Sequence, residues 1–123
     1  MRYFTREEAE ELLPEARRRI AAIATAVADL NVLSAAVETG DETQGGLAEA
    51  KALDALIHDE LAWFGREGIE VKGVAPGLLD FPALVDDRVI LLCWLEGEPA
   101  ISFYHPPETG FAGRAPLREL GGV

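Results

Sequence analysis

The hydrophobic period of this sequence changes once, at Gly68, and that change most limits what the chain can fold into. Before Gly68, apolar residues recur at spacings of three and four, which is typical of amphipathic helices. After it, the segment from Ile69 to Val74 alternates between apolar and polar residues, as a half-buried strand does. Helices followed by strands, rather than alternating with them, predict an α+β fold.

The beginning of the helical part has clear start and stop signals. Thr5 and Glu8 form a capping-box pattern, which predicts a helix beginning near Arg6. Because proline disrupts a helix interior, we expect a short capped helix to end near Leu13 and a longer helix to restart at Pro14. A single kinked helix is the alternative.

Two longer helices are predicted to form an antiparallel helical hairpin. The first carries an apolar seam with a/d spacing, and a glycine-rich connection from Gly40 to Gly46 then interrupts the pattern. The second runs from about Leu47 to Arg66 and ends at Gly65 or Gly68. The predicted seam residues are Ile20, Ile23, Val27, Leu30, Ser34 and Val37 on the first helix, and Leu53, Ile57, Leu61 and Phe64 on the second.

The second half of the chain predicts a small antiparallel sheet of about three strands. The expected strands are Ile69 to Val74, Val89 to Leu95 and Ala100 to His105. We expect Leu78 to Pro82 to form a loop and the tail from Pro106 onward to be irregular. No linker divides the chain, so residues 1–123 are expected to form a single domain, with the helical hairpin at 1–67 and the sheet and C-terminal loop at 68–123.

Charge and composition argue against several classes of partner. The chain has 22 acidic and 11 basic side chains, a net charge of −11, so we expect it to bind neither nucleic acid nor a membrane. Its longest uninterrupted apolar run, Val89 to Leu95, is too short to cross a bilayer. Met1 to Glu8 lacks the apolar segment of a signal peptide, and a lone Cys93 cannot form an internal disulfide, so we expect a cytoplasmic protein.

A tight turn at Gly97 and Glu98 would fix the register of the last hairpin. In that register Cys93 and His105 point to opposite faces of the sheet, while Trp94 shares the face of His105. This argues against a zinc or thiol–imidazole site, and no metal site is assigned, although a β-bulge would reverse the argument. The favoured interpretation of Cys93 is a small buried apolar residue.

His105 lies at a strand end that several charged residues are expected to approach. These residues are Asp80, Asp86, Asp87, Arg88 and Glu108. A histidine among carboxylates can bind a metal ion or act as a general acid or base. The structural alternative, which we favour, is that His105 orders the backbone around Pro106 by hydrogen bonding.

Two further features suggest binding chemistry only weakly. Gly110 to Arg114 could offer backbone N–H groups and a guanidinium to an anion, but it lacks the strand and helix of a phosphate-binding loop. Alternatively, Phe111 fills the core and Arg114 pairs with an internal carboxylate. His58 follows Asp54 by four residues on a helix, which predicts a surface pair.

Several dispersed motifs, taken together and in order, suggest a family. They are Phe4 to Ala9, Leu12 to Pro14, Gly77 to Ala83, Leu92 to Trp94, Gly97 with Glu98, His105, Gly110 to Arg114, and Pro116 with Leu117. In these motifs the chain resembles the prokaryotic proteins grouped as domain of unknown function 2203, over nearly its whole length. That family has no established activity, so the resemblance implies kinship without a mechanism. It implies that Asp80, Trp94, His105 and Arg114 match recurrent family positions, which makes them candidates for ligand binding.

Two functions fit these observations. The first is a non-enzymatic module that forms a homodimer through its helical hairpin, because the seam is flanked by alanines and one hairpin cannot cover two apolar sheet faces. The second is a metal-dependent or small-ligand enzyme with its site around Asp80, His105 and Arg114, aided by Glu108 or Asp86. The sequence identifies neither a cofactor nor a small-molecule ligand.

Overall fold

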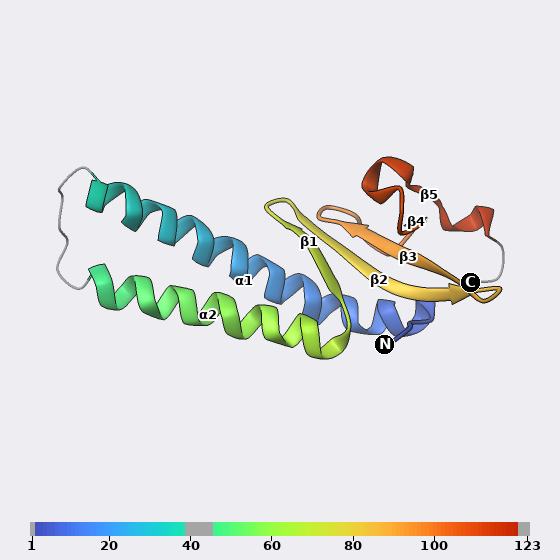
Figure 1. Cartoon of the computed structure of the whole chain (residues 1–123), viewed down its shortest axis with the longest axis horizontal. Helices are drawn as coiled ribbons and strands as arrows, with labels where there is room; N and C mark the ends of the chain where they lie inside the picture. Colours follow the sequence, from blue (N-terminus) through green and yellow to red (C-terminus); the bar gives the residue numbers. More distant parts are fainter. Residues whose placement is uncertain (1, 39–45, 121–123) are drawn as a thin grey trace.

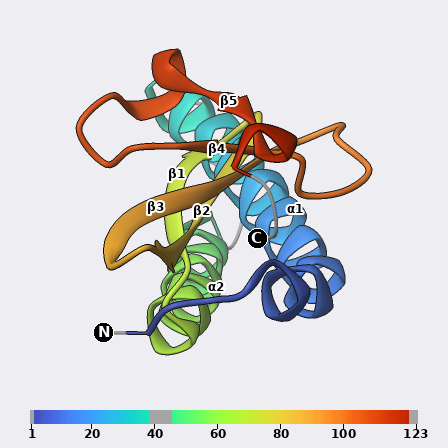
Figure 2. The same ribbon diagram turned by 90° about the vertical axis from the view of Figure 1, so that its right-hand side faces the viewer.

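A computed structural model describes residues 2–38 and 46–120 of the protein. A long helical hairpin packs beside a five-stranded antiparallel sheet whose strand order is β1-β2-β3-β4-β5 (Figures 1 and 2). The α+β prediction is therefore confirmed, while the expected three strands are five. The elements are α1 (Arg6–Glu38), α2 (Gly46–Glu67), β1 (Glu70–Val74), β2 (Gly77–Val85), β3 (Arg88–Leu95), β4 (Phe103–His105), the 3₁₀ helix η1 (Gly110–Gly113), β5 (Ala115–Pro116) and the 3₁₀ helix η2 (Leu117–Glu119).

Helix α1 runs unbroken through Pro14 for 33 residues, so the predicted end near Leu13 is wrong. The predicted capping box is present: the Thr5 hydroxyl accepts from the Glu8 N–H at 3.1 Å, and the Thr5 N–H donates to the Glu8 carboxylate at 2.9 Å. Pro14 is exposed, whereas Leu13 and Ala16 on either side of it are buried. Burial of those neighbours holds the helix together, and the hydrogen bond that proline removes is lost on the solvent side.

The helical hairpin is longer than the sheet, and its far half extends beyond it (Figure 1). Among the described residues, the last buried one on α1 is Ala26, and the only buried one on α2 is Phe64, near the sheet. We call the projecting part, residues 27–38 of α1 and 46–60 of α2, the arm. Residues 40–45 of the predicted connection and the side chain of Val37 lie outside the described residues.

The predicted seams are only partly buried. Ile20 and Ile23 are buried, but Ser34 and Leu61 are exposed and Leu33 is half-buried in place of Ser34. A straight α-helix has 3.6 residues per turn, so a strict repeat of three and four gradually rotates around its surface.

Strand β2 includes the segment Leu78 to Pro82, which was predicted from the sequence as a loop. Pro82 is tolerated because β1 pairs with β2 only as far as Asp80, so at Pro82 one edge of β2 faces no strand. A two-residue turn with positive φ at Asp86 and Asp87 joins β2 to β3, a geometry that matches the twist of a hairpin.

The two faces of the sheet contribute differently to the main core. The face toward the helices contributes to the main core, which contains Leu79, Phe81, Ala83, Ile90, Leu92 and Trp94 together with Ala9, Leu13, Ile20, Ile23 and Phe64 of the helices. The opposite face presents Asp80, Cys93 and His105, and the main core includes none of them.

Strand β4 pairs with β3 one residue away from the predicted register. His105 lies opposite Leu91, and Phe103 lies opposite Cys93. Because side chains alternate along a strand, Cys93 and His105 share a face, and Trp94 lies on the other. The sequence-based separation of Cys93 from His105 is therefore wrong.

The register differs because the connection between β3 and β4 is not a tight turn. Strand β3 ends at Leu95, and β4 begins only at Phe103. Within the connection, the Glu98 carboxylate accepts the Leu95 N–H at 2.7 Å, and the Ile101 N–H donates to the Glu10 carboxylate of α1 at 2.8 Å. The connection is thus positioned by side chains, and its length carries no register information.

Candidate functional site

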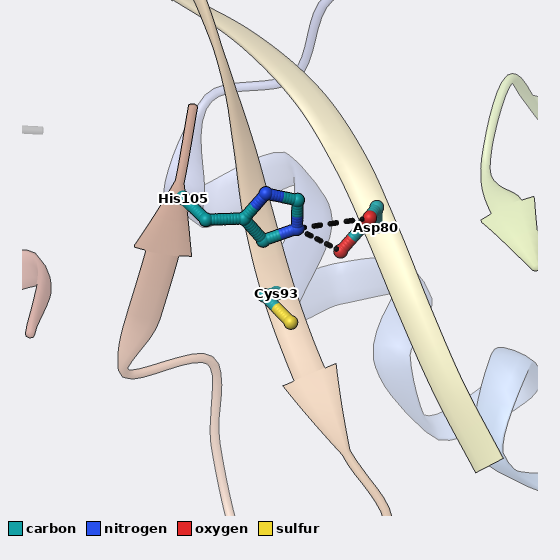
Figure 3. Close-up of side chains that lie close together, drawn as sticks. All are labelled: Asp80, Cys93 and His105. Atoms are coloured by element: carbon teal, nitrogen blue, oxygen red, sulfur yellow. Dashed lines mark hydrogen bonds and ion pairs between the residues drawn. The ribbon is translucent and has the colours of Figure 1, made fainter. Parts of the chain in front are cut away.

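Three buried polar residues come together on the face of the sheet away from the helices. Asp80 on β2 lies directly opposite Cys93 on β3, and His105 on the next strand completes the group. Their exposed fractions are 1%, 0% and 2%, respectively. Figure 3 shows the His105 ring reaching across β3 toward the Asp80 carboxylate, with the Cys93 sulfur on the same side. One ligand atom from each residue lies within 4.8 Å of the others.

The contacts of His105 define where its protons lie. Its Nδ1 is 2.8 Å from the carbonyl oxygen of Pro106, and because a carbonyl only accepts, Nδ1 carries a hydrogen. Its Nε2 is 3.1 Å and 3.0 Å from the two Asp80 oxygens. Neutral Nε2 and an ionised carboxylate are both acceptors, so a further proton lies between them. The predicted role of His105 as an anchor for the Pro106 backbone is therefore present, and its ring also contacts a carboxylate.

Lys72 links this buried group to the surface. Its Nζ is 3.2 Å from Asp80 and 3.1 Å from Glu70, and its side chain is 42% exposed. Burial lowers the pKa of Lys72, but the carboxylates of Glu70 and Asp80 outweigh it and leave the pKa above its ordinary value. The contact of Lys72 with Asp80 was not predicted from the sequence, because Lys72 lies where the β1–β2 register is irregular, between Val71 and Gly73.

Cys93 is protonated in this environment. Burial, followed by the negative charge of Asp80, raises the pKa of the Cys93 thiol to about 12. Nucleophilic cysteines need the thiolate at physiological pH. Cys93 is therefore buried as expected, its cross-strand partners are Asp80 and Phe103, and the uncharged thiol is no nucleophile.

Arg114 lies beside the cluster but already has a partner. Its Nη2 donates to both Glu98 oxygens at 2.7 Å and 2.8 Å and to the Cys93 carbonyl at 3.3 Å, and its guanidinium stacks 4.2 Å from the Phe103 ring centroid. The alternative of an internal carboxylate partner is thus confirmed, with Glu98 as the partner. Phe111 is 47% exposed, so its predicted role in filling the core is wrong.

The remaining charged candidates do not join His105. Glu108 lines a separate cavity of about 380 Å³ with Arg88, and His105 does not line that cavity. Asp86 and Asp87 form the β2–β3 turn. Of the acids expected around His105, Asp80 is in contact with it, whereas Asp86, Asp87 and Glu108 are not among its hydrogen-bond partners. His58 and Asp54 form the predicted surface pair, with Nδ1 3.6 Å from the carboxylate.

The chemistry of the cluster follows from its donor set. Sulfur, imidazole nitrogen and carboxylate oxygen are the three ligand types that bind zinc in proteins. The same three groups do not form a hydrolytic triad in this state, because the thiol is protonated and no member is exposed.

Comparison with known proteins identifies one family model, which matches residues 2–117 and is described as an uncharacterized conserved protein (DUF2203). No curated protein matches the chain. No solved structure matches it.

Proposed function

Because the chain belongs to the DUF2203 family of uncharacterized conserved proteins, we propose its function from its geometry: it is a non-enzymatic module that self-associates through its helical arm. The observation that carries the proposal is that, within residues 2–38 and 46–120, the arm has only two helices and no third layer. In a globular protein, an amphipathic helix is stabilised mainly by packing its apolar face against another element. A second copy of the arm supplies that element.

Helix α1 is apolar in composition, but most of it is not buried within the chain. An 18-residue window within Arg6–Ala36 has a mean hydropathy of 1.4, yet 17% of that window is buried in the chain. By length and composition alone, such a helix could also cross a membrane. The half of α1 nearer the sheet instead belongs to the core of the fold through Ile20 and Ile23. The half in the arm carries the acidic residue Asp29. A protein partner suits this helix better than lipid.

The outer surface of α1 is suited to close helix packing. Ala28, Val32 and Ala35 are exposed and recur at spacings of four and three, so they share one side of the helix. Val32 is 69% exposed, and residues 30–37 contain no charged side chain. By contrast, the arm portion of α2 contains charged side chains throughout, from Glu49 to Glu60. We therefore assign the contact to the Ala28–Val32–Ala35 side of α1, with two arms forming a four-helix bundle.

A pair of matched substitutions tests this assignment. Ala28→Glu places a charge on the proposed contact, and Ala52→Glu makes the same change at an exposed alanine of α2. Light scattering coupled to size exclusion should give wild type twice the chain mass of 13.3 kDa. Ala28→Glu should be monomeric at the same concentration, because dimerisation would bury an unpaired charge. Ala52→Glu should remain dimeric.

Three results would count against the proposal. A wild-type chain that stays monomeric at high concentration removes its basis. Loss of the dimer in Ala52→Glu but not in Ala28→Glu moves the contact to α2. Wild type that partitions into lipid vesicles, with no dimer in solution, favours a membrane partner instead.

The same proposal includes a cytoplasmic location and no nucleic-acid partner. It is supported by the free, buried Cys93 and by the net charge of −11.

A further inference from the structure

We propose that Asp80, Cys93 and His105 form a binding site for a single divalent transition-metal ion, with Zn²⁺ as the best match. The proposal is independent of self-association, because the three residues lie on the sheet and the arm projects beyond it. It changes the residues of the alternative site that was predicted from the sequence. Cys93 replaces Arg114, because Arg114 is already bound to Glu98.

The first support is the placement of the donors. They come from β2, β3 and β4, three adjacent strands in the middle of the sheet, so their spacing is fixed by backbone pairing. Sites built on strands hold ligands more precisely than sites on loops. Each residue offers one ligand atom, all within 4.8 Å of one another, and all three residues are buried.

The second support is the orientation of His105. A histidine that binds a metal through one ring nitrogen usually donates the other N–H to a carbonyl or carboxylate. His105 has this arrangement, since Nδ1 donates to the Pro106 carbonyl at 2.8 Å and Nε2 faces Asp80 and Cys93. Nε2 and the carboxylate are both acceptors, and a cation between them satisfies both. A proton does so in the absence of metal, and a zinc ion takes its place.

The third support is the charge balance of the bound state. Zinc binding requires the Asp80 carboxylate, neutral His105 and the Cys93 thiolate, so the thiol proton and the proton between His105 and Asp80 both leave to solvent. Two negative ligands and Zn²⁺ sum to zero, which suits a buried position. Three protein ligands leave the fourth position of a tetrahedral ion open to water.

Lys72 competes with the ion for Asp80. Its ammonium is 3.2 Å from Asp80 Oδ2, and its side chain is partly exposed, so it can move aside when a cation enters. Its contact with Glu70 at 3.1 Å gives the displaced ammonium a remaining partner. Removing the charge of Lys72 should therefore strengthen metal binding.

Cobalt titration of the full chain, freed of metal by a chelator, tests the site directly. We expect one Co²⁺ per chain, visible absorption of a tetrahedral ion, and a thiolate-to-cobalt charge-transfer band, all displaced by Zn²⁺. Since Cys93 is the only cysteine, that band can arise from no other residue. Absence of the band in folded wild type overturns the proposal without any variant.

Variants locate the other ligands. Cys93→Ala should remove the band, and Asp80→Asn should weaken Co²⁺ binding by more than the about 10–100-fold that outer-shell groups contribute. His58→Gln alters the only other histidine, which is exposed, and should change nothing. Lys72→Met should bind about 10-fold more tightly. Equal affinity in wild type, Asp80→Asn and Lys72→Met would show adventitious binding and refute the assignment.

Circular dichroism of each metal-free variant shows whether it still folds. If Asp80→Asn unfolds, Lys72→Met and Cys93→Ser still test the same site. Zinc should raise the melting temperature of wild type and not that of Cys93→Ala, whereas a purely structural Asp80–His105 pair predicts no effect of zinc on either.

Discussion

At the scale of single residues, the main feature is a buried polar group where a small sheet usually buries apolar side chains. An ionised carboxylate with 1% exposure must be neutralised, and Asp80 is neutralised from two sides, by His105 and by Lys72. The arrangement favours a cation beside Asp80 and disfavours a thiolate at Cys93 unless a metal ion accompanies it.

The Cys93 thiol should make the free energy of unfolding depend on pH in the alkaline range. Its pKa is 9.0 ordinarily and about 12 in the folded chain, so folding favours the neutral thiol. That stabilisation is complete below pH 9 and is lost as pH rises toward 12. Over this window the free energy of unfolding of wild type should fall by about 1.4 kcal/mol per pH unit relative to Cys93→Ala.

Urea denaturation of metal-free wild type and Cys93→Ala at a series of pH values measures this difference. The cavity left by alanine adds an offset that does not change with pH, so only the slope matters. Parallel curves between pH 9 and pH 12 would show that the thiol ionises in the folded chain as easily as in the unfolded one.

At the scale of elements, packing overrides a local signal in α1. Pro14 predicts a helix end, but Leu13 and Ala16 are anchored in the core, and the helix continues. Tertiary packing thus tolerates a residue that costs about 3 kcal/mol in an isolated helix interior.

Replacing Pro14 with alanine should therefore stabilise the protein. The substitution restores a backbone N–H that can donate to the Glu10 carbonyl and removes the steric conflict between the proline ring and that carbonyl, so the free energy of unfolding should rise by up to about 3 kcal/mol. Chemical denaturation at one fixed protein concentration measures the change. Pro107→Ala, an exposed proline outside any helix, should change it by less than about 1 kcal/mol. A destabilised Pro14→Ala would mean that α1 needs the geometry that proline imposes.

At the scale of the whole molecule, a compact sheet-and-helix body carries a two-helix arm with exposed apolar residues. In the arm, apolar side chains are left exposed to solvent. The buried cluster of Asp80, Cys93 and His105 lies on the face of the sheet away from the helices (Figures 1 and 3). The proposed association and the proposed metal binding therefore involve separate parts of the molecule, and each can be tested in the absence of the other.

The net charge predicts a characteristic salt dependence for the proposed self-association. Two copies of −11 each repel one another, while the proposed contact on α1 is uncharged. Screening should therefore tighten the dimer, so its Kd should fall as sodium chloride is raised. Sedimentation equilibrium at low and high salt measures the two values, and a dimer that weakens with salt would indicate ion pairs across the contact.

Some features of the protein follow from the sequence alone. The change of period at Gly68 predicts helices followed by strands, the Thr5–Glu8 pair predicts where α1 begins, and the motifs point to the family. These signals are local or depend on residue order, so they survive without knowledge of contacts. Asp80 and His105 were also recognisable as candidates, because both match recurrent positions of the family and His105 lies at a predicted strand end among charged residues.

The tertiary structure alone decides which candidates meet. A one-residue shift in strand pairing moves every side chain of a strand to the other face. The long β3–β4 connection does not set the register of β4 on β3, so packing and the hydrogen bond of Glu98 set it instead. In the observed register His105 joins Asp80 and Cys93, Trp94 turns into the core, and Lys72 reaches the cluster through an irregularity in β1. The spacing of these residues along the sequence predicts none of these contacts, because the contacts depend on how the strands pack against the helices.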